Sequence, residues 1–227
     1  MISDARGRDD YRATDGLRQL ALNYWRPLYV FLRKQGETHE DASDSVQGFF
    51  EHILGSGFLS HVDREGGKFR SYLLKSLTRW RSRERIRQGA IKRGGLVRHV
   101  CIDEIPVEEL ENELDLEGDE SPETAFDRQW ALEMVGRAVD SLSKDYERRG
   151  RSDWFRALRP GLPGSGEMAT YAELAAELHT TEGAIKKAAF DLRGAFANRL
   201  KEEIRSTVRS KEDAEEELRH LVAALSS

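Results

Sequence analysis

The sequence predicts an all-α protein with two small helical domains, joined by an acidic flexible linker, and a helix-turn-helix in the second domain. Apolar residues recur at intervals of three and four over most of the chain, which is the spacing of one helix face. No segment of strand length alternates apolar and polar residues. Hydrophobic residues make up 38% of 227 residues and charged residues 34%, which favours thin helical cores over a thick sandwich or barrel.

The first domain is expected to begin with a helix over residues 15–35, whose apolar residues share one face. Pro27 lies inside this pattern, so we expect a kink or a break there, and Gly36 should end the helix. Thr38 is placed to cap a second helix over residues 40–54.

Further helices are expected from Lys68 to about Gly89 and from Pro122 to Arg149. A Pro/Gly-rich loop and two more helical patterns follow, and the chain ends in a weakly amphipathic segment. The predicted organisation is a first domain at 12–98, an acidic linker at 99–124, a second domain at 125–208 and a C-terminal amphipathic tail at 209–227.

Charge is distributed very unevenly along the chain, although the net charge is only −5. Residues 64–100 contain 12 basic and 2 acidic side chains, whereas residues 101–127 contain 12 acidic and no basic ones. A block this basic indicates an anionic partner, and the acidic block, poor in aromatic residues, is typical of a linker.

The basic block predicts a surface for single-stranded nucleic acid. Arg79, Arg83 and Arg87 share one helix face, and Arg81 and Arg85 share another. Tyr72, Lys75 and Trp80 lie close by, and cations interleaved with aromatic rings suit a single strand because they bind phosphates and stack on bases. The alternative is a solvated helix face.

Residues 171–200 fit a helix-turn-helix. Ala175 is small where two helices must cross closely, and His179 stands where the turn needs a left-handed residue. Thr181 is expected to cap the second helix, and Ile185 to fill the core beneath it. In such a motif the start of the second helix enters the major groove, so the predicted duplex-binding residues are Thr181, Glu182, Lys186 and Lys187, with Arg193 near the backbone. The alternative is an ordinary helical hairpin.

No pattern in the sequence predicts catalysis, a metal or a cofactor. His39, His52 and His61, with Asp41 and Asp44, match no spacing of metal ligands. The single cysteine, Cys101, lies beside an acidic run that disfavours a thiolate. The start of the chain has no apolar stretch, so we expect neither a signal peptide nor a membrane anchor, and a cytoplasmic protein.

Asp41, Asp44 and Gln47 follow one another at intervals of three residues along the second predicted helix. They are interpreted either as ordinary surface residues or as an acidic face that docks a basic partner.

Three stretches together resemble the extracytoplasmic-function (ECF) sigma factors, the two-domain initiation subunits of bacterial RNA polymerase. RPLYVFLRKQGETHEDASDSVQGFFEHIL is similar to the start of the sigma2 domain, and GKFRSYLLKSLTRWRSRERIRQGAIKRGG to the part that opens and reads the −10 element. TYAELAAELHTTEGAIKKAAFDLR resembles the sigma4 helix-turn-helix that binds the −35 element.

The resemblance implies a protein that directs polymerase to specific promoters and is not itself an enzyme. The implied partners are promoter DNA, the β′ clamp and β flap of the polymerase core, and an anti-sigma or other regulatory protein. By this resemblance, the residues that dock on polymerase are Asp41, Asp44, Gln47 and Phe50. Those that bind the melted strand are Arg70, Tyr72, Lys75, Arg79, Trp80 and Arg83.

The chain departs from the family at several of these positions. Ser45 and Gly48 stand where Leu and Glu are usual, and Asp191 and Gly194 where basic residues are more frequent. These differences leave an alternative: a sigma-derived DNA-binding adaptor that serves another complex without supporting initiation. The acidic linker likewise has three interpretations: it mimics nucleic acid in the RNA-exit path, it screens the basic block, or it is a solvated tether.

Overall fold

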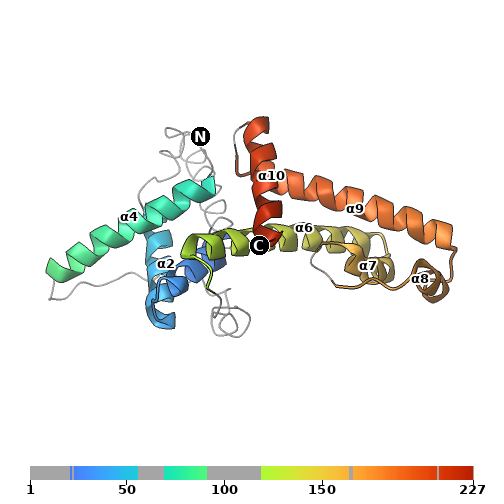
Figure 1. The fold of residues 1–227 in the computed structure, drawn as a ribbon, viewed down its shortest axis with the longest axis horizontal. Helices are drawn as coiled ribbons and strands as arrows, with labels where there is room; N and C mark the ends of the chain where they lie inside the picture. The colour runs from blue at the N-terminus through green and yellow to red at the C-terminus, as the bar shows by residue number, and fades with distance from the viewer. Residues whose placement is uncertain are drawn as a thin grey trace, which may run out of the picture. The chain divides into compact units, whose positions relative to one another are not determined.

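Every regular element that the structure describes is helical, which confirms the predicted all-α class (Figure 1). This computed structural model describes residues 21, 23–55, 69–90, 119–163, 166–208 and 210–226. The elements in chain order are a helix over residues 23–34, α2 (His39–Gly55), α4 (Phe69–Ala90), α6 (Pro122–Arg148), α7 (Ser152–Leu158), the 3-10 turn η1 (Arg159–Gly161), α8 (Tyr171–Glu177), α9 (Glu182–Arg205) and α10 (Lys211–Ser226). Residues 99–118 of the predicted linker, Cys101 and His61 lie outside the described residues.

The helix over residues 23–34 continues through Pro27, so the predicted break is absent. A proline inside a helix costs about 3 kcal/mol. Burial on both sides of Pro27 offsets this cost, because Tyr24 is 2% exposed and Leu28 is completely buried.

The same helix ends at Gly36, as predicted. Gly36 has a φ of +86°, and its N–H donates to the carbonyl of Arg33 at 2.9 Å. The next N–H, that of Glu37, donates to Leu32 at 3.2 Å, which completes a Schellman motif. This turn sets the position of Glu37 directly before α2.

The chain divides into two compact units, Met1–Ala131 with Arg219–Ser227, and Leu132–Leu218. Both boundaries between these units fall inside helices, α6 and α10. The start of α6 belongs to the first unit because its apolar side chains are buried there: Phe126 and Trp130 are each 1% exposed. The end of α10 joins the same unit through His220, whose Nε2 lies 2.8 Å from Oδ2 of Asp127.

The core of the first unit is formed by apolar faces of the helix over 23–34, α2, α4 and the start of α6. Its largest fully buried side chains are Tyr24, Leu28, Tyr29, Leu32, Phe49, Phe50, Ile53, Leu73, Leu77, Phe126 and Trp130. Burial of each leucine or phenylalanine contributes about 1.5–3 kcal/mol. The face of α4 opposite Leu73 and Leu77 is therefore left exposed.

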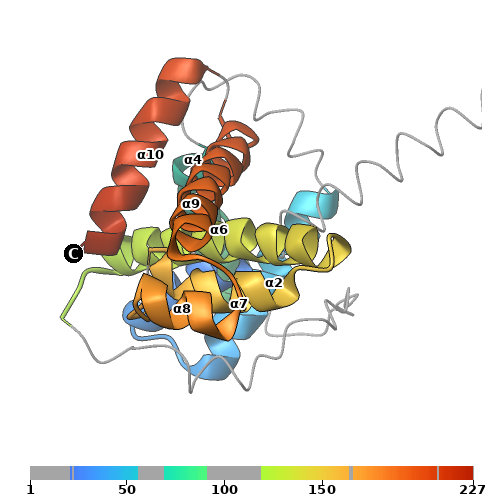
Figure 2. The same cartoon turned by 90° about the vertical axis from the view of Figure 1, so that its right-hand side faces the viewer.

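In the second unit, α9 runs antiparallel to the later part of α6 (Figures 1 and 2). Arg137 of α6 lies 3.0 Å from Glu203 near the end of α9, whereas Asp145, two turns further along α6, lies 2.8 Å from the earlier Arg199. Between the helices lie buried residues of α9 at helical spacing: Ile185, Ala189, Leu192, Phe196, Leu200 and Ile204.

Candidate nucleic-acid interface

The turn between α8 and α9 has the geometry predicted for a helix-turn-helix (Figure 2). His179 has a φ of +49°, and no other residue except glycine has a positive φ among those described. The N–H of His179 donates to the carbonyl of Ala176 at 3.3 Å, and the N–H of Thr180 to that of Ala175 at 2.9 Å. These two bonds form a Schellman motif with His179 in place of the usual glycine. The predicted left-handed turn is confirmed.

Both helices of the motif begin with a threonine cap. The N–H of Ala184 donates to Oγ1 of Thr181 at 3.2 Å, as predicted for the start of α9. At α8, Thr170 and Glu173 form a reciprocal capping box. The hydrogen bonds from Thr170 lower the pKa of the Glu173 carboxyl below its usual value. The two caps fix where each helix begins, and with it the face that α9 exposes.

Buried small and apolar residues hold α8 against α9. Ala175 is 7% exposed, and Ile185 is completely buried, which are the positions predicted for the helix crossing and the core beneath it. Because Ile185 points inward, the predicted duplex-binding residues Thr181, Glu182, Lys186 and Lys187 are all exposed. They lie within the first two turns of α9, so one partner can reach all four.

Acidic side chains on α9 itself neutralise part of its basic surface. Nζ of Lys186 lies 3.6 Å from Oε2 of Glu182 and also approaches the ring of Tyr171, at 5.8 Å from its centroid. Lys187 pairs with Asp191 at 2.8 Å. The two lysines of α9 are therefore each paired with a carboxylate one helical turn away.

Arg193, the fifth predicted duplex-binding residue, is exposed but held against a neighbouring loop. Its Nε donates to the carbonyl of Gly161 at 3.4 Å, and its Nη2 lies 3.5 Å from the hydroxyl of Tyr171. A position beside α8 and η1, away from the tip of the motif, suits contact with a backbone phosphate better than contact with a base.

Phe190 is absent from the sequence-based prediction and is a conspicuous feature of the motif. Its side chain is 75% exposed on α9, whereas Phe196 of the same helix is 6% exposed. The sequence does contain a signal for this exposure. Ile185, Leu192 and Phe196 share one helix face, and Phe190 lies outside that spacing.

In the first unit, α4 exposes a stripe of three cations. Lys75, Arg79 and Arg83 follow one another at intervals of four residues and are exposed, and they form no ion pair with any residue that the structure describes. Two hydroxyl residues beside the stripe, Thr78 and Ser82, bond to carbonyls of the preceding turn of α4. This outer stripe (Lys75, Arg79 and Arg83) presents three exposed cations of α4 that can receive phosphates.

Two of the other predicted strand-binding residues of α4, Arg70 and Trp80, make contacts within the first unit. Arg70 is 6% exposed, donates to Asp127 and lies over the ring of Trp130, 5.0 Å from its centroid. Tyr72 is half-buried. Trp80 packs on α2, with its ring 5.9 Å from that of Phe49. Arg70 and Trp80 thus fix α4 in place rather than extend the outer stripe.

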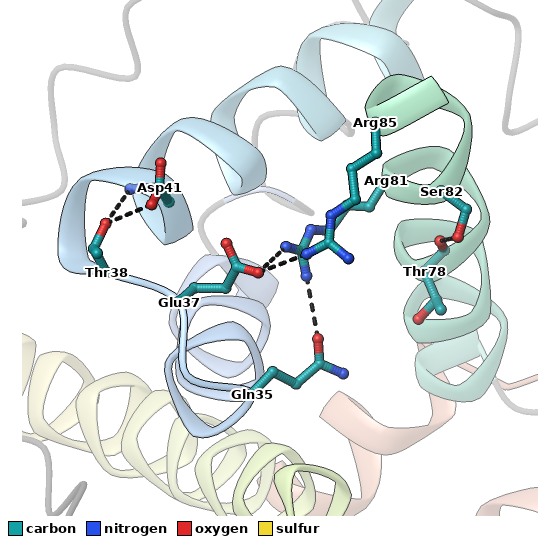
Figure 3. A network of polar contacts seen from close by, with 8 residues as sticks. All are labelled: Gln35, Glu37, Thr38, Asp41, Thr78, Arg81, Ser82 and Arg85. Atoms are coloured by element: carbon teal, nitrogen blue, oxygen red, sulfur yellow. Dashed lines mark hydrogen bonds and ion pairs between the residues drawn. The ribbon is translucent and has the colours of Figure 1, made fainter. Parts of the chain in front are cut away.

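A network of polar contacts uses two more arginines of the basic block (Figure 3). Glu37 accepts hydrogen bonds from Arg81 and Arg85, and Arg81 also donates to Oε1 of Gln35 at 3.1 Å. The side chain of Arg81 is 10% exposed and that of Arg85 is 69% exposed. The network thus joins α4 to the turn before α2, and it uses the charge of Arg81 internally.

A groove of about 500 Å³ lies beside the outer stripe, between α4 and the start of α6. Lys75 and Arg79 line one side, and Glu123 and Asp127 line the other. The acidic side limits how many phosphates can enter the groove, so the basic end of the stripe near Arg83 is the more favourable place for a backbone.

The predicted docking residues do not form one surface. Asp41 and Asp44 are exposed on α2, and Gln47 is half-buried and donates to Oε1 of Glu51 at 3.3 Å. Asp41 also takes part in the start of α2, since its N–H donates to Oγ1 of Thr38 at 3.1 Å. Phe50 is 2% exposed and belongs to the core, so the docking contact predicted for it does not fit its burial.

Gly48, one of the departures from the family pattern, has a structural reason. A Cβ at this position would lie 3.1 Å from Cη2 of Trp80. Glycine therefore lets the indole approach α2 closely, and this contact holds the middle of α4.

Within the described part of the chain, no three His, Cys, Asp or Glu side chains are grouped to hold a metal ion. None of the described helices is long and apolar enough to cross a membrane. We found no match to this chain among models of protein families, among curated proteins or among solved structures.

Proposed function

We propose that this protein is an ECF-type sigma factor that directs bacterial RNA polymerase to specific promoters. It would bind the −35 element as duplex through α9 and the −10 element as a melted single strand through the outer stripe of α4. In this role it is not an enzyme, needs no cofactor and works in the cytoplasm with the polymerase core, including its β′ clamp and β flap. An anti-sigma protein would be a further partner.

The observation that carries the proposal is the left-handed turn at His179, between two capped helices. This turn leaves the first turns of α9 exposed, with Lys186 and Lys187 outward, which is the surface that a helix-turn-helix presents to a major groove. The resemblance of three stretches to one family, in the family's order, supports polymerase as the complex that uses it.

The outer stripe of α4 supports the second part of the proposal. Its three cations stand at successive turns of the helix, which matches the way proteins follow the phosphates of a single strand. Removal of one cation that binds a phosphate should lower the salt dependence of single-strand binding, by about 0.7 in the slope of log K against log salt. Arg79→Ala should show this decrease. Arg156→Ala, which removes another exposed arginine, from α7, should not.

Assembly with bacterial core polymerase tests the proposal as a whole. The wild-type chain should bind the core. The resulting complex should make thymines in promoter DNA reactive to permanganate, and the core alone should leave them unreactive. Asp44→Lys should weaken core binding at least tenfold, and Asp140→Lys, the same reversal on the exposed side of α6, should leave it unchanged. Duplex binding without any opened promoter would overturn the proposal and favour the adaptor that serves another complex.

A further inference from the structure

Phe190 occupies the middle of the exposed face of α9. It lies three or four residues from Lys187 and Gly194, and all three are on the side of the helix opposite Leu192. Burial of a phenylalanine contributes about 1.5–3 kcal/mol to stability, so the fold gives up this contribution at Phe190. A single exposed apolar side chain is common on protein surfaces, and its surroundings decide whether it has a use.

Two glycines stand on the exposed face of α9 that carries Phe190 and Lys187. Gly183 and Gly194 lie on the same face, about two turns before Phe190 and one turn after it. A Cβ at Gly194 would meet nothing within 4 Å, and one at Gly183 would meet only Oγ1 of Thr181, at 3.9 Å. Packing therefore requires neither glycine, although Gly194, inside α9, costs about 1 kcal/mol relative to alanine.

The chemistry of this face favours duplex DNA as its occupant over another protein. Lys187 lies beside Phe190 with a side chain 76% exposed, and Lys186 lies one turn before it. An apolar patch that docks a protein is usually broad, whereas here one ring stands between glycines and cations. The major groove offers the matching pattern: phosphates at its edges and the C5-methyl group of thymine as its apolar feature.

We propose that Phe190 determines part of the sequence specificity of this protein by packing on the C5-methyl group of a thymine in the duplex site. The inference rests on the proposed function, because it requires α9 to lie in a major groove. Gly183 and Gly194 let the backbone of α9 approach the bases closely enough for the ring to reach the methyl group.

Replacing thymine with deoxyuridine tests this contact, since it removes only the methyl group. Duplex sites are first selected from a random pool by the wild-type chain, and each thymine is then replaced in turn. At one position the affinity of the wild type should fall about fourfold, the effect of losing one buried methyl group. Phe190→Ala should bind the thymine site about as weakly as the wild type binds the deoxyuridine site, and should no longer distinguish the two.

Ile86→Ala is the matched control, because Ile86 is also 75% exposed but lies on α4. This variant should keep the full deoxyuridine effect. Equal deoxyuridine effects in the wild type and Phe190→Ala would overturn the inference, as would weakened polymerase binding in Phe190→Ala with unchanged duplex binding. A wild-type chain that selects no duplex site would instead overturn the proposed function itself.

Discussion

In α9, Nζ of Lys187 lies 2.8 Å from Oδ2 of Asp191, one turn further along the exposed surface of the helix. Exposed pairs of this kind contribute only about 0.3–0.5 kcal/mol to stability. Under the proposed function their effect on DNA should be larger, because Asp191 takes up the charge that Lys187 would offer to a phosphate. The pair should then lower the affinity of α9 for any duplex, whatever its sequence.

Asp191→Asn should raise the affinity for duplex DNA about threefold to tenfold at low salt, through the loss of one carboxylate close to the backbone. The slope of log K against log salt should steepen by up to about 0.9. Titration of a fluorescent duplex at several salt concentrations measures both quantities. Glu202→Gln, which removes a carboxylate near the far end of α9, is the control and should change neither. An unchanged affinity in Asp191→Asn would show that Lys187 does not face the DNA.

Glu37→Gln should lower the free energy of unfolding by about 2 kcal/mol, because it leaves the nearly buried guanidinium of Arg81 without a charged acceptor. Arg85→Ala should cost less than about 1 kcal/mol, since Arg85 is 69% exposed. Urea denaturation of both variants measures the difference. Equal losses would contradict the dominant role of the contact between Glu37 and Arg81.

Gly48→Ala should change the free energy of unfolding through two opposing effects. A double-mutant cycle with Trp80→Ala separates them. Alanine gains about 1 kcal/mol of helix propensity over glycine. In the wild type this gain should be cancelled, because the new methyl group would lie 3.1 Å from the ring of Trp80. In a Trp80→Ala background the gain should appear in full. The same gain in both backgrounds, measured in urea, would contradict the close contact of Trp80 with α2.

Asp145 should make the second unit sensitive to acid. The hydrogen bond from Arg199 holds the pKa of the Asp145 carboxyl below its ordinary value, and Arg148 acts in the same direction. A lowered pKa stabilises the folded state above the unfolded-state pKa of about 4, and this contribution is lost as pH falls through the folded-state value. In thermal unfolding, the difference between wild type and Asp145→Asn should therefore shrink below about pH 4. A difference that stays constant there would argue against the Arg199 contact, and Asp140→Asn controls for general loss of charge.

The local features of the fold could be predicted because each depends on neighbours in the sequence. Thr181 and Gly36 begin and end helices through bonds to backbone groups within a few residues. The left-handed turn at His179 follows from the spacing of two helical patterns with a residue between them that tolerates a positive φ. Pro27 was the exception, since burial of the side chains on both sides of it outweighed its local preference.

The inward contacts of the basic block could not be predicted, because they join distant parts of the chain. Arg70 meets Asp127 across 57 residues, and Arg81 meets Glu37 across 44. Helical spacing groups the arginines by face but does not say which face meets a carboxylate. Phe50 could not be placed from the sequence either. The family motif implied a docking role at the surface, but its side chain lies in the core.

Transcription by bacterial core polymerase from a pool of genomic fragments, with the 5′ ends of all transcripts sequenced, tests promoter recognition most directly. With the wild-type chain, the account predicts new start sites that share two upstream motifs at a fixed separation. Asp44→Lys should abolish these transcripts while leaving duplex binding intact. No start sites beyond those of the core alone, from a chain that still binds core and duplex, would contradict the account.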